Sequence, residues 1–278
     1  MRKWGAAIFL IVAACQQQPA KPAAGADQIA FEGAQVSDAA AIRAHGERLT
    51  HVLGCTGCHG IHLEGTFFTE HEPQYGPLYA SNLSVELPGL SDAQIEDVLR
   101  KGVHPERKTV WGMPSEIFQH LSAADMTALI AYLRSIKPVG KKLPPPQFSA
   151  QDKKDIAAGQ YKPAVTGVRE TKDVFPVDAG AQHALGRYIA SVTCAECHSP
   201  KLEGKPGDPV GKIPDLIVAG GYSRAEFETL ITTGVPVGGR KLNPMMSGVA
   251  KTRFSHLTPH ERDALYAYLK ARAEMPKR

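Results

Sequence analysis

The sequence predicts an all-α protein made of two tandem domains, and three observations lead to this prediction. The stretch "VLGCTGCHGIHLEG" (52–65) returns as "SVTCAECHSPKLEG" (191–204), so one short motif occurs twice. Amphipathic segments with helical spacing recur after each copy, as in a tandem duplication. Strand signals are absent from the sequence apart from short apolar pieces. The 278 residues are enough for two domains of ordinary size.

Three helices are expected in each domain, over 39–53, 91–102 and from Ser122 in the first, and over 181–192, 223–234 and from Thr258 in the second. Ser91 with Gln94 forms a capping box at a helix start, and Gly102 is a left-handed stop at its end. The same signals recur in the second copy, from Ser223 to Gly234. The domains are predicted at 37–138 and 179–278. The linker between them, 139–178, is long enough that part of it is expected to pack across both domains.

Composition narrows the class of protein. A hydrophobic content of 43% with 22% charged residues is typical of a globular protein, and argues against a disordered or multi-span membrane protein. The balance of 32 Lys and Arg against 28 Asp and Glu leaves a net charge of only +4, and no run resembles a nucleic-acid-binding surface. Aromatic content is 7%, which predicts thin cores filled by something besides side chains. Because the net charge is small and no run of residues is typical of nucleic-acid binding, we expect no nucleic acid partner.

The N-terminus predicts export. Residues 1–14 carry Arg2 and Lys3 followed by an apolar run too short to span a bilayer, as in a secretory signal peptide. The run ends in "VAAC", which resembles a bacterial lipobox and makes Cys15 the lipidated first residue of the mature chain. The alternative is an ordinary signal peptide with an incidental cysteine. Residues 15–36 are a polar, Pro/Ala-rich stretch, predicted to be a flexible tether to a bacterial membrane on the periplasmic side.

The repeated C-x-x-C-H pattern is the attachment signature of c-type haem. Its two copies are Cys55, Cys58 and His59, and Cys194, Cys197 and His198. Each pair of thiols would bond the two vinyl groups of one porphyrin, and the adjacent imidazole would bind its iron. A redox-active disulfide needs a βαβ context that the sequence lacks, and a zinc site needs four ligands per domain. The sequence therefore predicts two covalent haems.

The sixth iron ligand decides what each haem does, because a thioether closes the iron and an open face permits peroxide or gas chemistry. In the first domain Met113 stands between two helices in a Gly-Met-Pro setting, although a Met can equally fill a core gap. In the second domain Met245 and Met246 compete. We prefer Met246, because the small residue after it replaces the Pro of the first domain.

The histidines include other candidates for this position, namely His62, His71, His256 and His260. His62 is too close to His59 to reach the opposite face of the haem. His120 and its repeat equivalent His256 are expected to be structural. Four others are expected to be solvated: His45, His51, His104 and His183. A ligating imidazole usually donates its other nitrogen to a carbonyl, and Pro77 and Pro214 lie at suitable distances along the chain for this role.

The stretch "YASNLSVELPGLSDAQIEDVLRKGVHPERKTVWGMP" (79–114) resembles the haem domains in cytochrome subunits of bacterial membrane-associated alcohol and related dehydrogenases. This resemblance implies two class I cytochrome c domains, each a small helical fold wrapped around one covalent haem with His/Met ligation. The second domain follows the family more loosely, since it lacks the Met-Pro pair and has a longer stretch before Phe254. Those dehydrogenase cytochromes usually carry three haems, whereas this chain carries two attachment motifs.

The expected function is electron transfer. The resemblance implies redox protein partners, a dehydrogenase or other donor on one side and an oxidase or soluble cytochrome acceptor on the other. The alternative is a di-haem peroxidase or small-molecule oxidoreductase with an open iron in the second domain. The sequence shows no catalytic base or substrate pocket, so the carrier is favoured.

Overall fold

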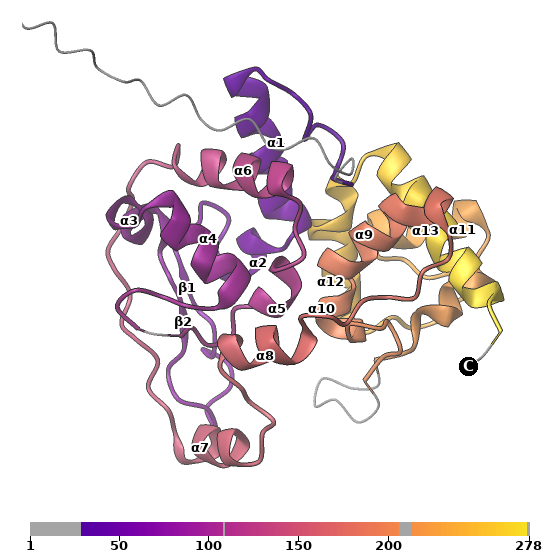
Figure 1. Cartoon of the computed structure of the whole chain (residues 1–278). Coiled ribbons are helices and arrows are strands. Elements are labelled where there is room, and N and C mark those ends of the chain that lie inside the picture. The colour runs from indigo at the N-terminus through magenta and orange to yellow at the C-terminus, as the bar shows by residue number, and fades with distance from the viewer. Residues whose placement is uncertain (1–28, 108, 206–212, 277–278) are drawn as a thin grey trace, which may run out of the picture.

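The computed structural model describes residues 29–107, 109–205 and 213–276. It is mostly helical, with two clusters of helices side by side and the C-terminus at the far end of the second cluster (Figure 1). The all-α prediction is confirmed. The signal peptide predicted over 1–14 and Cys15 lie outside the described residues. Among the residues that are described, no helix is both long and apolar enough to cross a membrane.

The first cluster contains six α-helices, one 3₁₀ turn and a minimal antiparallel strand pair in which Thr66 faces Ala80. Its elements are α1 (Ala39–Val52), α2 (Cys55–His59), β1 (Thr66–Phe67), β2 (Tyr79–Ala80), α3 (Leu83–Glu86), η1 (Leu87–Gly89), α4 (Asp92–Lys101), α5 (Ser115–Phe118) and α6 (Ala123–Leu133). The segment that follows adds α7 (Ala150–Ala157) and α8 (Ala164–Thr171).

Among its described residues, the second cluster repeats this order, with a single antiparallel bridge between Lys205 and Ile213 in place of the strand pair. Its elements are η2 (Ala181–His183), α9 (Ala184–Val192), α10 (Ala195–His198), η3 (Leu216–Gly221), α11 (Arg224–Thr233), α12 (Pro244–Thr252), η4 (Phe254–His256) and α13 (Pro259–Glu274). The predicted helix starts are present in both copies. Ser91 and Ser223 each close a reciprocal capping box, and Gly102 and Gly234 end α4 and α11 with φ values of 65° and 68°.

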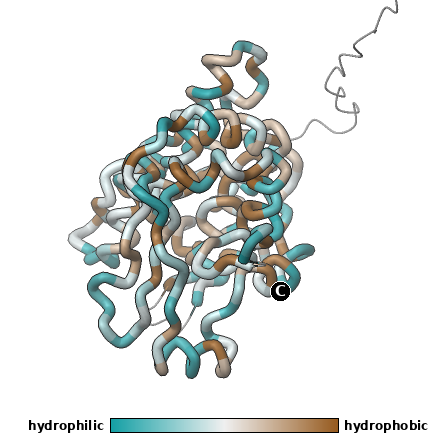
Figure 2. The backbone as a smooth tube through the Cα atoms, turned by 90° about the vertical axis from the view of Figure 1, so that its left-hand side faces the viewer, coloured by the Kyte–Doolittle hydropathy of each residue, from teal (hydrophilic) through white to brown (hydrophobic). Residues whose placement is uncertain are grey.

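Each cluster is built on two helices that cross at a glycine. A Cβ atom on Gly46 of α1 would lie 2.0 Å from the carbonyl oxygen of Ala128 in α6, and one on Gly186 of α9 would lie 2.0 Å from that of Ala264 in α13. The two backbones therefore touch, and the helices bury their apolar faces against each other. Figure 2 shows hydrophobic and hydrophilic residues interspersed along the backbone, and each of the four helices carries hydrophobic residues that are buried.

The two clusters contact each other through equivalent positions. Arg48, two residues after Gly46, forms an ion pair of 2.7 Å with Glu261 of α13, whose side chain is fully buried. Tyr188, two residues after Gly186, donates its hydroxyl to Asp125 of α6 (2.7 Å), which is also fully buried. Each domain thus reaches the carboxylate at the start of the other domain's terminal helix, which joins the two clusters by a pair of matched contacts.

The predicted tether, 15–36, is not free over its last residues. Phe31 is 2% exposed and packs edge-on against Tyr188, with ring centroids 5.4 Å apart. Its backbone N–H donates to Asp125 (3.1 Å), and that of Glu32 donates to Glu261 (2.8 Å). The prediction was wrong here because two buried carboxylates, far away in sequence, accept hydrogen bonds from this segment.

The linker, 139–178, packs on both domains. Near its start, the backbone N–H of Gln147 donates to the carbonyl of Pro77 (3.0 Å), and α7 and α8 lie against the first domain. Near its end, the hydroxyl of Tyr268 donates to the carbonyl of Val177 (2.8 Å) in the second domain. The linker is therefore a structured part of the fold.

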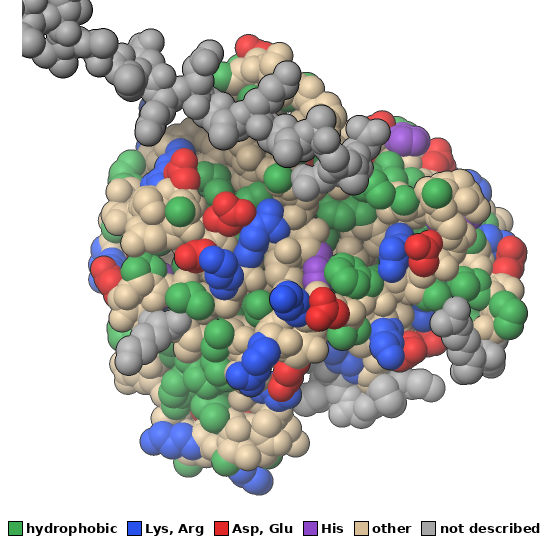
Figure 3. Space-filling view, in the orientation of Figure 1, with side chains coloured by type: hydrophobic (Ala, Val, Ile, Leu, Met, Phe, Trp, Pro, Cys, Tyr) green, Lys and Arg blue, Asp and Glu red, His purple; other side chains and the backbone are tan. Residues whose placement is uncertain are grey.

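Charged side chains of both signs are mixed over the surface. On the face shown in Figure 3, Lys and Arg side chains lie beside Asp and Glu side chains. Some ion pairs lie along a single helix, such as Arg100 with Glu96 (2.7 Å) and Arg224 with Glu228 (2.8 Å). Pairs of this kind stabilise a helix by only ~0.3–0.5 kcal/mol each.

Candidate haem sites

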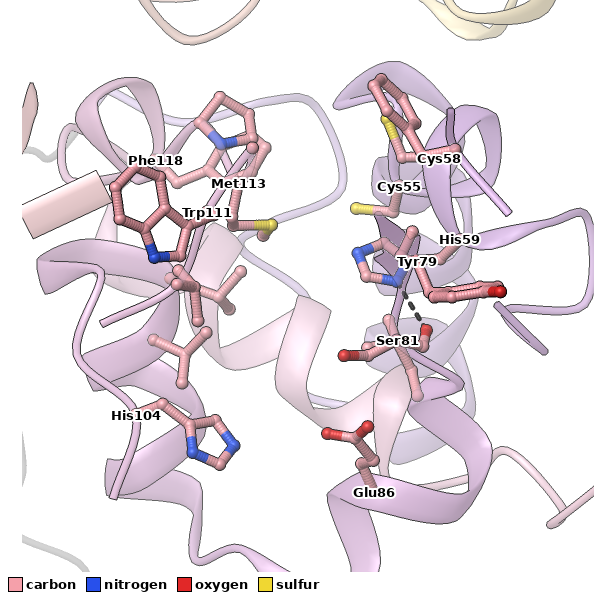
Figure 4. A pocket seen from close by; sticks show the side chains of 18 of the residues that line it. Cys55, Cys58, His59, Tyr79, Ser81, Glu86, His104, Trp111, Met113 and Phe118 are labelled. Atoms are coloured by element: carbon pink, nitrogen blue, oxygen red, sulfur yellow. Dashed lines mark hydrogen bonds between the residues drawn. The ribbon is translucent and has the colours of Figure 1, made fainter. Parts of the chain in front are cut away.

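The first domain contains a cavity of about 380 Å³ with mostly apolar walls. Cys55, Cys58 and His59 of the first C-x-x-C-H motif lie on one side of it. Met113 and Trp111 lie on the other side (Figure 4). Apolar residues from α4 and α6 complete the walls: Ile95, Val98, Leu99, Leu129 and Leu133. The sequence segments that carried the haem prediction are therefore brought together around one cavity.

A backbone carbonyl orients each proximal histidine. Nδ1 of His59 lies 2.8 Å from the carbonyl oxygen of Ser81, and Nδ1 of His198 lies 2.8 Å from that of Pro214. A carbonyl only accepts, so Nδ1 carries the proton in each ring and Nε2 keeps a free lone pair for a metal. Pro214 is confirmed as a partner. The prediction that Pro77 is the partner of His59 is wrong. The Pro77 carbonyl accepts a hydrogen bond from the linker, and Ser81, directly after β2, accepts from the histidine instead.

Burial sets the protonation of both motifs. It lowers the pKa of His59 and of His198, so each imidazole is neutral and able to ligate at neutral pH. It also raises the pKa of Cys55 to about 12 and that of Cys194 to about 11. Redox-active cysteines have the opposite property, a lowered pKa that favours the thiolate. Cys55, Cys58 and Cys194 are free thiols, and their surroundings argue against a redox-active disulfide.

The Leu-Glu-Gly that follows each motif forms the same turn in both domains. Leu63 and Leu202 are almost fully buried and have φ values of 59° and 64°, a conformation that is rare for leucine. The N–H of Gly65 then donates to the carbonyl of His59 (2.6 Å), and that of Gly204 to His198 (2.9 Å). This turn folds the chain back behind the histidine, which explains why the sequence repeats beyond the cysteines.

The methionines differ between the domains. Met113 follows Gly112 (φ 72°) and points into the cavity from the side opposite His59 (Figure 4). In the second domain both candidates lie in α12, where Met245 is 51% exposed and Met246 packs, partly buried, against the hydrophobic core.

Two histidines expected to be solvated are buried. His45 is 5% exposed, and its Nε2 lies 2.8 Å from Oδ1 of Asp125. His104 is 5% exposed and lines the cavity of the first domain. The prediction was wrong because a buried polar side chain needs a partner or a cavity that the local sequence does not reveal. His51 stacks on His256 with centroids 4.3 Å apart, and three other histidines are exposed: His62, His71 and His260.

The residues around the cavity fit a haem. A porphyrin bound through two thioethers needs a pair of thiols, a neutral imidazole with a free Nε2 and an apolar enclosure. The first domain offers all three, together with a thioether opposite the imidazole. In the second domain, the thiols and imidazole of the second motif lie on the equivalent helical turn. Nδ1 of His198 donates to a backbone carbonyl in the same way as Nδ1 of His59.

The cytochrome c family model matches the chain twice, over residues 43–137 and 183–273. The chain belongs to the cytochrome c family. It is a di-haem class I cytochrome c, with one C-x-x-C-H motif in each matched region. Its c-type haems make electron transfer its general function, and proteins of this family are typically extracytoplasmic. No curated protein matches the chain.

The sequence analysis missed the part that the linker plays in this cytochrome. Phe148 lines the cavity and packs edge-on against Trp111, with ring centroids 4.9 Å apart. Tyr161 packs on the same Trp111 at 5.1 Å. The linker therefore builds the wall beside Met113. The Pro run at 144–146, followed after one residue by the aromatic Phe148, is the sequence signal for this closure.

Glu196 was missed as well. It stands between the two cysteines of the second motif, yet it lines the cavity of the first domain. Sequence alone gives no sign of this, because it depends on how the two domains pack.

Proposed function

We propose that this cytochrome is a membrane-anchored periplasmic electron carrier, which passes electrons from a dehydrogenase or other donor to a respiratory acceptor. The observation that carries the proposal is the arrangement of His59 and Met113, which face each other across an apolar cavity. An imidazole and a thioether on opposite sides of an iron leave no position for a substrate. The haems supply one-electron exchange at the iron, and the protein's own residues determine the environment in which it occurs.

The proposed axial pairs are His59 with Met113 and His198 with Met246. Met246 is favoured over Met245 because it packs inward, whereas half of the Met245 side chain is exposed. Ser81 and Pro214 hold the two imidazoles in one tautomer and one orientation through their carbonyls. These bonds keep Nε2 directed at the metal position in both redox states.

The remaining residues exclude water and set the redox potential. A thioether ligand raises the potential, and an apolar surrounding keeps solvent away from the iron. In the first domain Trp111 and Phe148 close the side of the cavity next to Met113. In the second domain the methionine lies within a helix and lacks the following proline. We therefore propose that the two potentials differ, which would give electron flow a direction.

The anchor and the partners rest on the sequence. The "VAAC" stretch supports lipidation of Cys15, and residues 79–114 support a role beside a membrane-associated dehydrogenase. Mass spectrometry of the protein purified from membranes tests the anchor, with a Cys15→Ser variant as the control. A wild-type N-terminus without a lipid mass, or a Cys15→Ser variant that stays membrane-bound, would contradict it.

Optical spectroscopy of the purified protein tests the carrier function. We expect two haems per chain, both low-spin, both with the charge-transfer band of methionine–iron ligation and neither able to bind carbon monoxide. A high-spin haem that binds carbon monoxide or reacts with peroxide would contradict the proposal. It would favour a di-haem peroxidase or small-molecule oxidoreductase, and the second domain would be the place to look for its open iron.

A further inference from the structure

The interface between the domains brings the two haem-attachment motifs together. Glu196, inside the second motif, reaches the cavity of the first domain. Its carboxylate forms an ion pair of 2.7 Å with Nη1 of Arg253. Nε of the same arginine donates to the carbonyl of Val52 (3.2 Å), three residues before Cys55. One guanidinium therefore holds the chain next to the first motif and a side chain within the second.

Arg253 is enclosed at this position. It is only 8% exposed and lies against Gly54, where a Cβ atom would come within 2.8 Å of the guanidinium carbon. Gly54 has φ +81°, so both its conformation and its lack of a side chain make room for the arginine. Nη2 of Arg253 is buried and has no hydrogen-bond partner among the described residues. Part of its charge is therefore left without a partner in a region of low polarity.

The charge of Arg253 acts on a cysteine thiol of each motif. Burial raises the pKa of the Cys55 thiol, and the positive charge of Arg253 acts against that rise. The same two effects operate on the Cys194 thiol. Glu196 acts in the opposite sense on the Cys55 thiol, where it adds to the rise in pKa that burial causes. Two charges of opposite sign thus lie within electrostatic reach of thiols that would hold the two haems.

The two copies of the repeat differ at both members of this pair. The repeat places Phe118 opposite Phe254, so the first domain has Ile117 where the second has Arg253. Between the two cysteines of the motif, the first domain likewise has Gly57 at the position that Glu196 occupies in the second domain. Ile117 is 3% exposed and belongs to the hydrophobic core. A buried ion pair is often no more stabilising than well-packed apolar residues of similar volume, so stability alone does not account for an arginine at this position.

We propose that Arg253 and Glu196 are positioning residues that hold the two attachment motifs in contact and set both haem potentials with opposite charges. The proposal rests on the electron-carrier function and adds the place where electrons pass between the domains. A buried positive charge favours reduction of a nearby iron, and a negative charge opposes it. The pair therefore keeps the domains together at their motifs while its two charges partly cancel.

Redox titration followed by optical spectroscopy, on the full haem-loaded chain, tests this inference with two neutral amides. Arg253→Gln is expected to lower the potentials, and Glu196→Gln is expected to raise them. The expected shift is on the order of tenfold in the one-electron equilibrium constant, or about 59 mV. The double variant should return towards the wild-type values. If Arg253→Gln does not fold, the upward shift in Glu196→Gln still decides the question.

Arg48→Gln is the matched control. Arg48 also joins the two domains by an ion pair to a buried carboxylate, but its hydrogen bonds all lie outside the two motifs. It should leave both potentials unchanged. A shift of the same sign in Arg253→Gln and Glu196→Gln, no shift in either, or an equal shift in Arg48→Gln would overturn the inference. The wild-type spectrum is recorded first, so an open iron, which would refute the carrier function, is recognised separately.

Discussion

The two domains of this cytochrome agree where they attach haem and differ where they close over it. On the attachment side, His59 and His198 have the same carbonyl bond of 2.8 Å and stand on the same turn. On the opposite side, Met113 lies in a loop after Gly112, walled by the linker, whereas Met246 lies in α12. Duplication has thus kept the chemistry of attachment and left the other side free to change, which is where a redox potential is tuned.

The contacts between the domains differ in the same way. Equivalent positions on α1 and α9 carry Arg48 and Tyr188, and each reaches a buried carboxylate of the other domain. The geometry is repeated, but one contact is an ion pair and the other is a hydrogen bond from a neutral hydroxyl. A symmetric scaffold therefore carries unequal chemistry, and each difference can be tested by matched substitutions in the two halves.

The largest effect is expected from the methionines. Met113→Ala and Met246→Ala should each remove one charge-transfer band, lower one potential by more than ~59 mV, the equivalent of a tenfold change for one electron, and allow carbon monoxide to bind. Met245→Ala is the control and should change none of these. Spectra and redox titrations of the three variants measure the outcome. If Met245→Ala behaves as described for Met246→Ala, the ligand in the second domain has been assigned to the wrong neighbour.

Alanine substitutions at the two helix crossings should lower the free energy of unfolding by similar amounts. Gly46→Ala and Gly186→Ala each place a Cβ atom 2.0 Å from a facing carbonyl oxygen. Alanine improves helix propensity by ~1 kcal/mol, but the forced separation of the helices costs about 3 kcal/mol or more. Both variants should therefore lower the free energy of unfolding in denaturant titrations. A variant as stable as the wild type would show that the crossing in that domain is looser than described.

Loss of the two matched interdomain contacts should reduce stability by unequal amounts. Arg48→Met leaves Glu261 buried without its charged partner and should cost about 2–3 kcal/mol of stability. Tyr188→Phe removes the hydrogen bond that the hydroxyl donates to Asp125, which keeps His45 and Ser122 as partners, and the one that it accepts from the backbone N–H of Ser122. It should cost about 1–2 kcal/mol. Denaturant titrations at one salt concentration measure both. Equal losses would mean that the charge on Arg48 adds nothing beyond a hydrogen bond.

The smallest effect concerns pH. Burial, with the nearby His51 and Arg48, lowers the pKa of His256 below its usual 6.5. As the pH falls below 6.5, the unfolded chain therefore takes up a proton before the folded one does, and stability is lost. His256→Phe keeps the ring stack on His51 but removes this titration. Its stability should fall less than that of the wild type between pH 7 and about pH 5. Parallel curves for the two proteins would argue against this role.

Local signals in the sequence predicted the elements of the fold well. Ser91, Gly102 and their repeat equivalents define helix ends through bonds within one turn, so the sequence contains all that is needed. The attachment motifs are equally local. The burial of His45 depends on Asp125, which lies 80 residues away. No periodicity or spacing reports such a contact, and the prediction of a solvated side chain was wrong for that reason.

The sites were predicted only in part, for a related reason. Each motif and Met113 could be proposed from spacing, but the cavity wall contributed by Phe148 and the reach of Glu196 into the first domain depend on how distant segments pack. Ser81 replaced Pro77 as the partner of His59 because a two-residue strand pair positions it. Contacts that need the whole fold are therefore the ones that the sequence could not supply.

The most direct test of the central claim, that duplicated haem sites have been made unequal within an electron carrier, is a potentiometric titration of the intact wild-type protein followed by its optical spectrum. We predict two one-electron steps at resolved potentials, both between low-spin states. A single step that accounts for both haems, or a step that ends in a high-spin haem, would contradict the account.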